Sequence, residues 1–298
     1  MGFDEELRGR TEYCNRVLER FLPEEKGYPR TVIEAMNYSV RAGGKRLRPM
    51  LTAETSAMYG SRPALAEPFM AALEMIHSYS LVHDDLPEMD NDEYRRGKKT
   101  THAVYGQGMA VLAGDGLLNY AYETAMKSFA EAQSAEETER VVRALQLLAA
   151  GAGIFGMVGG QCCDLDSEKK RIDGDTLLYI HRNKTAAMIR SGFQIGAILA
   201  GAPEIDIRGL GEIADDIGIA FQIRDDILDV EGDPEELGKT LGKDAEEAKA
   251  TYVSIFGMEK AKEDAERMTE EALRRFDALS ARNPFLRELI VSLAGRTH

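Results

Sequence analysis

One stretch of this chain combines an apolar helix with a dense group of charges, and it limits the folds that the chain can adopt. Residues 64–86 are apolar on every side of a helical pattern, so we expect a central, buried helix. The pattern ends in Asp84 and Asp85, and Pro87 then disfavours a helical conformation for the residue before it. We therefore expect Asp90 to fold back beside the first two aspartates.

The charges after this helix indicate a site for metal ions and phosphate. Carboxylates at the end of a buried helix repel one another unless a cation lies between them, and Mg²⁺ and Ca²⁺ bind to such oxygens. Arg95 and Arg96 follow closely and suit phosphate oxygens. A solvated acidic surface is the simpler alternative in a chain with 51 acidic residues, but this group ends an apolar helix. A calcium loop is the other alternative, and it requires glycine where Arg95 stands.

A second acidic group occurs far downstream in the apolar segment FQIRDDILDV, residues 221–230. Asp225 and Asp229 are four residues apart and share one helix face, with Gln222 one turn earlier on the same face. Asp226 lies off that face. One such group is a weak signal, but two groups on separate apolar helices can hold several Mg²⁺ ions around one diphosphate.

The basic residues are grouped as well, although each group alone has an ordinary explanation. Lys45 and Arg48 lie beside glycines in GGKRLRP, and an exposed turn is the favoured interpretation of that motif alone. For Lys239 and Lys249, which flank a charged loop, a solvated role is the favoured interpretation. Lys184 and Thr185 lie on a helix that becomes apolar, where an ordinary exposed lysine and a functional one are equally favoured. His77 lies two turns before Asp84 on nearly the same face, where a core histidine is the usual case.

The whole chain favours one all-α domain over residues 1–298, a helical bundle with its functional groups inside. It has 44% hydrophobic residues, and no convincing alternating strand pattern or flexible linker divides it. The expected helices cover residues 31–40, a segment beginning near Pro49, and residues 64–86, 108–132, 173–200, 205–230, 258–280 and 284–293.

Charge and composition restrict the partners and the compartment. The net charge of −14 disfavours nucleic acid as a partner. Three cysteines, two of them adjacent, indicate a reducing compartment, and the acidic N-terminus is unlike a signal peptide. The longest apolar run, residues 145–160, is interrupted by glycines and falls short of the roughly 20 residues of a membrane span. We expect it to form a buried helix pair in a cytoplasmic protein.

Taken together, these motifs resemble the trans-isoprenyl diphosphate synthase (polyprenyl synthetase) family, in particular its bacterial farnesyl diphosphate synthases. The resemblance runs in order over about residues 41–252. The motifs that carry it are GGKRLRP, DDLPEMDND with RRG, GQ at 160–161, the KT pair at 184–185, FQIRDDILD, and GKTLGKD with Lys249. It implies an all-α bundle around a deep central cavity and, usually, a homodimer.

The resemblance also implies the roles of the grouped residues. Each role is transferred from a matching motif position. The implied Mg²⁺ ligands, with supporting members, are Asp84, Asp85, Asp90, Asp225 and Asp229. The implied contacts of the allylic diphosphate are Arg95, Lys184, Thr185, Gln222, Lys239 and Lys249. The implied contacts of isopentenyl diphosphate are Lys45, Arg48, His77 and Arg96. Glu88 departs from the family pattern, which usually has a small residue there.

The implied reaction is a head-to-tail prenyl transfer, the dimethylallyl- and geranyltranstransferase activities of a farnesyl diphosphate synthase. About three Mg²⁺ ions per active site, replaceable by Mn²⁺, would neutralise the leaving diphosphate. Lys184, Thr185, Asp84 and Asp225 are the residues expected to act on the reacting allylic group. No side chain is an obvious general base, so the departing diphosphate is the expected proton acceptor.

The length of the product depends on what lies beneath the first aspartates. Tyr79 is five residues before Asp84, so about 7.5 Å deeper along the helix. An aromatic residue there resembles farnesyl (C15) enzymes, whereas Met or smaller residues accompany C20 enzymes. The alternatives are a geranylgeranyl (C20) or geranyl (C10) diphosphate synthase, a terpene cyclase, which would lack the isopentenyl site, and a non-catalytic subunit. The presence of every expected charged ligand argues against the last.

Overall fold

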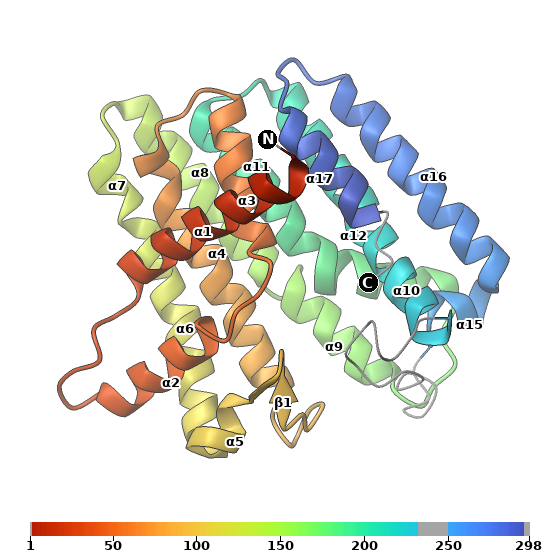
Figure 1. Cartoon of the computed structure of the whole chain (residues 1–298), viewed down its shortest axis with the longest axis horizontal. Helices are drawn as coiled ribbons and strands as arrows, with labels where there is room; N and C mark the ends of the chain where they lie inside the picture. The colour runs from red at the N-terminus through yellow and green to blue at the C-terminus, as the bar shows by residue number, and fades with distance from the viewer. Residues whose placement is uncertain (1, 232–249, 295–298) are drawn as a thin grey trace. The chain divides into compact units, whose positions relative to one another are not determined.

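The apolar stretch with which the sequence analysis began forms helix α4, Pro63–Asp84, in a computed structural model that describes residues 2–231 and 250–294. Proline begins α4, as expected for the first helical turn. Buried side chains occur on all sides of α4, and its main neighbours are α6 (Gln107–Met126) and α3 (Leu47–Met58) (Figure 1). The predictions of a central helix and of an all-α fold are confirmed.

The described chain divides into two compact units. Within the described residues, unit 1 comprises residues 2–145 and 198–200, and unit 2 comprises residues 146–197, 201–231 and 250–294. The remaining elements of unit 1 are α1 (Phe3–Phe21), α2 (Arg30–Val40), β1 (Tyr94–Arg95), β2 (Lys98–Lys99), α5 (Thr101–Tyr105) and α7 (Ser128–Glu131). The elements of unit 2 are α9 (Met157–Ser167), α10 (Gly174–Ile180), η1 (His181–Ala186), α12 (Glu204–Glu231), α15 (Tyr252–Phe256), α16 (Met258–Asp277) and α17 (Pro284–Ala294). Two further helices cross the division, α8 (Ala135–Ala152) and α11 (Ala187–Ala200).

Unit 1 differs from the sequence expectations in two places. The polar sequence over residues 87–108 predicts an irregular segment, but Tyr94 pairs with Lys99 in a short antiparallel hairpin and α5 follows directly. The helix expected over residues 108–132 is two helices, since α6 ends at Met126 and a separate short helix follows Lys127. The hairpin is too short for an alternating sequence pattern to reveal it.

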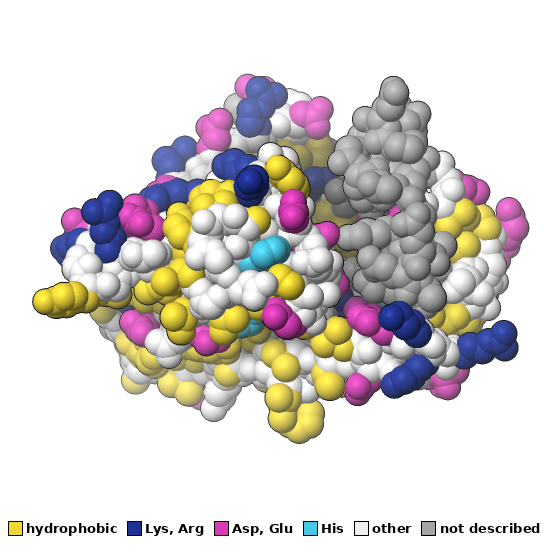
Figure 2. Space-filling view, turned by 90° about the horizontal axis from the view of Figure 1, so that it is seen from below, with side chains coloured by type: hydrophobic (Ala, Val, Ile, Leu, Met, Phe, Trp, Pro, Cys, Tyr) yellow, Lys and Arg dark blue, Asp and Glu magenta, His cyan; other side chains and the backbone are white. Residues whose placement is uncertain are grey.

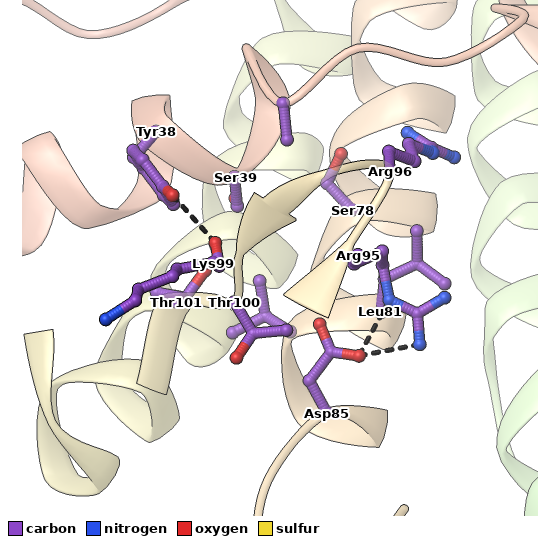
Figure 3. Close-up of a pocket in the computed structure, with 12 residues that line it drawn as sticks. Tyr38, Ser39, Ser78, Leu81, Asp85, Arg95, Arg96, Lys99, Thr100 and Thr101 are labelled. Carbon is purple, nitrogen blue, oxygen red and sulfur yellow. Dashed lines mark hydrogen bonds and ion pairs between the residues drawn. The ribbon is translucent and has the colours of Figure 1, made fainter. Parts of the chain in front are cut away.

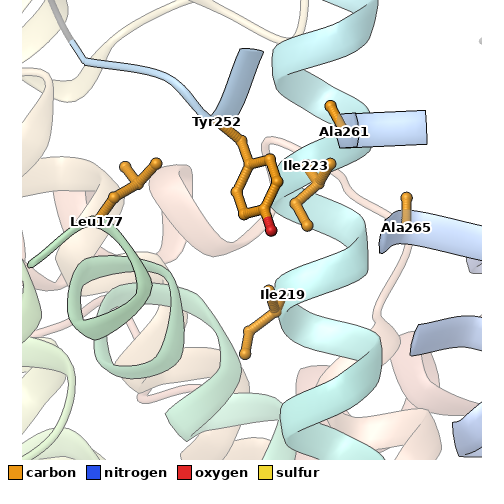
Figure 4. Packing of buried hydrophobic residues seen from close by; sticks show 6 residues of the cluster. All are labelled: Leu177, Ile219, Ile223, Tyr252, Ala261 and Ala265. Carbon is orange, nitrogen blue, oxygen red and sulfur yellow. The ribbon is translucent and has the colours of Figure 1, made fainter. Parts of the chain in front are cut away.

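A hydrophobic core in unit 2 packs against the long helix α12. Its residues Ile219 and Ile223 are buried against Leu177 of α10, Tyr252 of α15 and the small side chains of α16 (Figure 4). The hydroxyl of Tyr252 donates to Asp264 over 2.9 Å, which satisfies a buried polar group at the edge of this core. One face of α12 is thereby committed to the core, and the face with Asp225 is left for other contacts.

The helix expected over residues 173–200 runs through three segments rather than one. Between α10 and α11 the chain makes a π-helical turn, η1, over residues 181–186. Such wide turns inside helices are often found at functional sites. Here the turn contains Lys184 and Thr185, the two residues singled out from the sequence.

The prediction of a buried helix pair over residues 145–160 is wrong in part. Ile154 and Phe155, in the turn between α8 and α9, are 68% and 87% exposed. Among the described residues, one helical stretch, Ala135–Ser167, is long and apolar enough to cross a membrane by length and composition alone. It is interrupted by the turn after Ala152, and a criterion of this kind is also met by helices of soluble proteins.

Candidate active-site residues

The first aspartate group of unit 1 has the arrangement expected from the sequence. Asp84 is the last residue of α4, and the backbone N–H of Asp90 donates to the carbonyl of Asp84 over 2.9 Å. Asp90 is therefore folded back beside the helix end. The C-terminus of a helix carries partial negative charge, so two carboxylates there favour a bound cation.

This pair has the donor set that Mg²⁺ requires. Mg²⁺ takes one or two carboxylates and completes its shell with water and phosphate oxygens. Within residues 2–231 and 250–294, no group of three or more His, Cys, Asp and Glu side chains could hold a metal ion by itself. Asp84 and Asp90 thus fit a metal that a phosphate substrate helps to bind.

Asp85 forms an ion pair with Arg95. Its carboxylate is buried and accepts hydrogen bonds from Arg95, at 2.7 Å from Nε and 2.6 Å from Nη2 (Figure 3). Burial raises the pKa of Asp85, while the guanidinium of Arg95 opposes that rise. The pair holds Arg95 in place close to the first aspartate group; metal binding by Asp85 stays a prediction.

The residues expected to hold isopentenyl diphosphate are concentrated at one end of unit 1. Arg96 donates to the carbonyl of Gly43, and its Nη2 lies 3.5 Å from Nε2 of His77. Arg48 interacts electrostatically with both Arg96 and His77, and its buried Nε has no hydrogen-bond partner among the described residues. Lys45 is exposed in the loop that contains Gly43. We call Lys45, Arg48, His77 and Arg96 the basic cradle.

The basic cradle is electrostatically prepared for an anion. Burial holds the pKa of His77 well below its usual value, and the neighbouring arginines lower it further, so the imidazole is uncharged at neutral pH. Burial also lowers the pKa values of Arg48 and Arg96. Cations held this close repel one another, and an oxygen-rich dianion relieves that repulsion.

Gly44 allows the guanidinium of Arg96 to lie against the backbone. An added Cβ at Gly44 would be 2.5 Å from Nη1 and 2.9 Å from Cζ of Arg96. Gly44→Ala should therefore displace Arg96 and raise the KM for isopentenyl diphosphate about tenfold, equivalent to the loss of roughly one charged hydrogen bond. Steady-state kinetics with the second substrate saturating provide the measurement.

Gly60→Ala is the matched control for this prediction. Both glycines have positive φ, 82° at Gly60 and 134° at Gly44, so alanine is strained at either position. An added Cβ at Gly60 has no atom within 4 Å. Equal effects of the two substitutions on that KM would show that strain, and not displacement of Arg96, is responsible.

In unit 2, the second aspartate group borders a pocket of about 150 Å³. Four residues predicted from the sequence line it: Lys184, Thr185, Gln222 and Asp225. The hydroxyl of Thr185 donates to Oε1 of Gln222 over 2.5 Å, so η1 and α12 are joined at this point. The ammonium of Lys184 lies 2.6 Å from Asp164 of α9. We call this the unit 2 pocket.

The other aspartates of the second group are less accessible than Asp225. Asp226 is buried, and its carboxylate accepts a hydrogen bond of 2.6 Å from the backbone N–H of Tyr252, which ties the start of α15 to α12. Asp229 is also buried, and its supporting role at the metal stays a prediction. Lys239 and Lys249 lie outside the described residues.

Gly160 of α9 sets the distance between α9 and η1. An added Cβ would lie 2.7 Å from the carbonyl carbon of Asn183 and 2.8 Å from Cα of Lys184, and nearer still to the nitrogen of Lys184. The glycine thus permits direct backbone contact at the turn that carries Lys184. This close backbone contact is a physical reason for glycine at the first position of the GQ motif at 160–161.

A second pocket, beside the hairpin, lies among Ser39, Ser78, Thr101 and the Asp85–Arg95 pair (Figure 3). Its volume of about 30 Å³ suits one or two water molecules. The hydroxyl of Tyr38 closes one side by donating to the carbonyl of Lys99 over 2.7 Å. Arg95 and Arg96 also border this pocket, which is too small for a substrate.

The chain is similar to known proteins over most of its length. The sequence profile of the family named polyprenyl synthetase matches residues 29–284. The chain belongs to the polyprenyl synthetase family. It is 41% identical to the farnesyl diphosphate synthase of Geobacillus stearothermophilus, with 100% of this chain and 99% of that protein covered. It is 43% identical to the geranylgeranyl diphosphate synthase of Cyanophora paradoxa, over 89% of this chain and 87% of that protein.

A solved structure of the family shows the same fold. The geranyltransferase of Helicobacter pylori, in complex with magnesium and isoprenyl diphosphate, has a TM-score of 0.83 and 30% sequence identity, covering 99% of this chain and 97% of that one. The match spans both units of this polyprenyl synthetase.

The sequence motifs of this polyprenyl synthetase do not reveal the contacts of two charged residues. Asp164 lies one turn after Gln161, and its carboxylate pairs with Lys184. Arg46 lies inside the GGKRLRP motif, and it is buried and paired with Glu74. A buried charge requires a partner, but the sequence does not show which residue that partner is.

Proposed function

We propose that the protein is a Mg²⁺-dependent prenyltransferase that condenses isopentenyl diphosphate with C5 and C10 allylic diphosphates to give farnesyl diphosphate. Two separate sets of residues carry this proposal: the basic cradle in unit 1 suits one diphosphate, and Lys184, Thr185 and Gln222 of the unit 2 pocket suit a second one. A prenyl chain-elongating enzyme binds two diphosphates, whereas a cyclase of one prenyl diphosphate has no need for the cradle.

The side chains divide the work as follows. Lys184 and Gln222 bind the allylic diphosphate, and Gln222 orients the hydroxyl of Thr185 so that its dipole can stabilise a developing allylic cation. Arg48, His77 and Arg96 hold isopentenyl diphosphate. Its double bond attacks the cation, and the proton lost from the new carbon chain goes to the released diphosphate. Water must be excluded at this step, because it would otherwise trap the cation as an alcohol.

The metal proposal rests on the aspartates already described. Asp84 and Asp90 would bind Mg²⁺ in unit 1, and Asp225 in unit 2. When bound, Mg²⁺ neutralises the diphosphate and makes it a better leaving group. The Helicobacter pylori relative was solved with magnesium. We propose about three ions per active site, with Mn²⁺ as a substitute.

Tyr79 is proposed as the floor of the product cavity. It is buried in α4, and burial raises its pKa to about 12, so the ring stays uncharged. The imidazole of His83 packs edge-on against it, with ring centroids 5.8 Å apart, and lies 3.2 Å from the carbonyl of Val111. Gly114 leaves the space that this imidazole occupies. An edge-to-face aromatic pair in this position would block a growing chain.

Tyr79→Ala should lengthen the product from C15 to C20 or beyond. The substitution removes the ring and opens a space beneath the aspartates. Mass spectrometry of the prenyl products from a C5 primer is the measurement. An unchanged C15 product would exclude Tyr79 as the floor, and a wild-type product of C20 or C10 would instead support the alternative chain lengths.

We also propose a cytoplasmic homodimer in which residues 1–298 form one polyprenyl synthetase domain. Exposed apolar side chains that support self-association include Leu112 on α6, 55% exposed, and Phe155. The family profile extends over both units. On the face in Figure 2, basic side chains are interspersed with acidic ones, which does not suggest a nucleic-acid partner. Sedimentation equilibrium should give about twice the 32.9 kDa of one chain.

The deciding experiment uses the purified protein with Mg²⁺, isopentenyl diphosphate and, separately, C5, C10 and C15 allylic diphosphates. We expect C15 product from the first two primers, no turnover of the third, and complete loss of activity with EDTA. Condensation without metal would contradict the metal proposal. Absence of condensation with every primer would favour the non-catalytic subunit.

A further inference from the structure

Arg46 differs from the other cations of the GGKRLRP loop because it is enclosed by the protein. Its side chain is 5% exposed. The guanidinium donates to Oδ1 of Asn15 over 2.8 Å, to Oε1 of Glu74 over 2.6 Å and to the carbonyl of Val40 over 2.7 Å. These bonds link the loop to three helices of unit 1, namely α1, α4 and α2.

The backbone of Arg46 is held in an unusual conformation. Its φ of 51° lies in the left-handed region, which residues other than glycine seldom adopt. The loop directs Lys45 to the exposed side and begins α3, the helix that carries Arg48. Surrounding contacts must impose such a conformation, and the three bonds of the Arg46 guanidinium are contacts of the residue itself.

Glu74, the partner of Arg46, lies on the same helix as His77 of the basic cradle. It is 2% exposed and precedes His77 by three residues, so the two lie about one turn apart on α4. Burial lowers the pKa values of Arg48 and Arg96, and the charge of Glu74 is the next influence on each and opposes that effect. Glu74 therefore attracts the same two cations that a diphosphate would bind.

We infer that Arg46 is a positioning residue for isopentenyl diphosphate, because it holds the GGKRLRP loop in its left-handed turn and neutralises Glu74 within the protein. Arg46 acts without touching the substrate. With its charge matched by Arg46, Glu74 leaves Arg48 and Arg96 available to the diphosphate. The inference rests on the proposed role of the basic cradle.

Three variants separate this role from a contribution to folding alone. Arg46→Met removes the charge and all three bonds, and leaves Glu74 as an unpaired buried carboxylate. Arg46→Lys retains a positive charge to pair with Glu74, but lysine lacks the planar guanidinium whose N–H groups also donate to Asn15 and Val40. The double variant Arg46→Met with Glu74→Gln removes both charges. Arg10→Met is a matched control, because the Arg10–Glu54 pair likewise joins α1 to another helix of unit 1.

The test measures KM separately for isopentenyl diphosphate and for geranyl diphosphate, with thermal unfolding of each variant in parallel. We expect Arg46→Met to raise the first KM at least tenfold and to leave the second within twofold. The double variant should recover a large part of that loss, since no buried carboxylate then competes for Arg48 and Arg96. Arg10→Met should change neither KM by more than twofold.

Other outcomes would overturn the inference. Equal changes in both KM values, or a loss confined to kcat, would make Arg46 a structural residue only. A double variant as impaired as Arg46→Met would exclude competition by Glu74. If Arg46→Met does not fold, Arg46→Lys provides the test. We expect Arg46→Lys to raise the KM for isopentenyl diphosphate at least threefold and to leave the KM for geranyl diphosphate unchanged. A wild-type protein without any condensation would instead refute the proposed function.

Discussion

Replacing Asp84 with asparagine is expected to lower kcat by about a thousandfold at saturating Mg²⁺. Asp84 ends α4, where the partial negative charge of the helix terminus and the adjacent Asp90 favour a bound cation. Asparagine retains an oxygen but not the charge, so it weakens metal binding while preserving the size of the side chain. Single-turnover rates at increasing Mg²⁺ concentrations are the measurement, because a weakened metal site also shifts the Mg²⁺ dependence upward.

Glu88→Gln provides the control for the charge of this segment. Glu88 is exposed in the same loop and has no proposed ligand role. Its neutralisation should change kcat by less than threefold, an effect typical of an exposed charge. A comparable loss in both variants would indicate that the net charge of the loop, and not a metal ligand, governs the rate.

Gly160→Ala is expected to lower kcat by about a hundredfold and to reduce the free energy of unfolding by about 3 kcal/mol. The added methyl group meets the backbone of Asn183 and Lys184. Backbone cannot rotate away as a flexible side chain does, so α9 and η1 must separate. That separation pulls Lys184 from Asp164 and disturbs the hydroxyl of Thr185, which is bonded to Gln222. Chemical denaturation and steady-state kinetics measure the two effects.

Gly9→Ala tests whether alanine in a helix is harmful in itself. Gly9 lies within α1, and an added Cβ there has no atom within 4 Å. Alanine should stabilise the protein by about 0.5–1 kcal/mol and leave the kinetics unchanged. If Gly160→Ala retained wild-type kcat and stability, the contact between α9 and η1 would have no part in placing Lys184.

The primary sequence predicted the features that depend on local order. An apolar pattern on all sides gave α4, and proline three residues after Asp84 predicted that Asp90 returns to the helix end, as its hydrogen bond to the Asp84 carbonyl shows. The four-residue spacing of Asp225 and Asp229 predicted a shared helix face. The order of the motifs predicted the polyprenyl synthetase family, which the comparisons confirm. These are properties of short segments, whose periodicity and steric limits are encoded in neighbouring residues.

Tertiary structure decided which of the charges pair within the protein. Asp85 is committed to Arg95, and Arg46 to Glu74, although neither acid differs in sequence from an exposed or metal-binding one. It also showed that Phe155 is exposed where the apolar run predicted burial, and that Gly160 lies against the turn containing Lys184. Each of these depends on contacts between residues distant in the chain. Burial makes an unpaired charge costly, and the partner that relieves the cost is determined only when the helices pack.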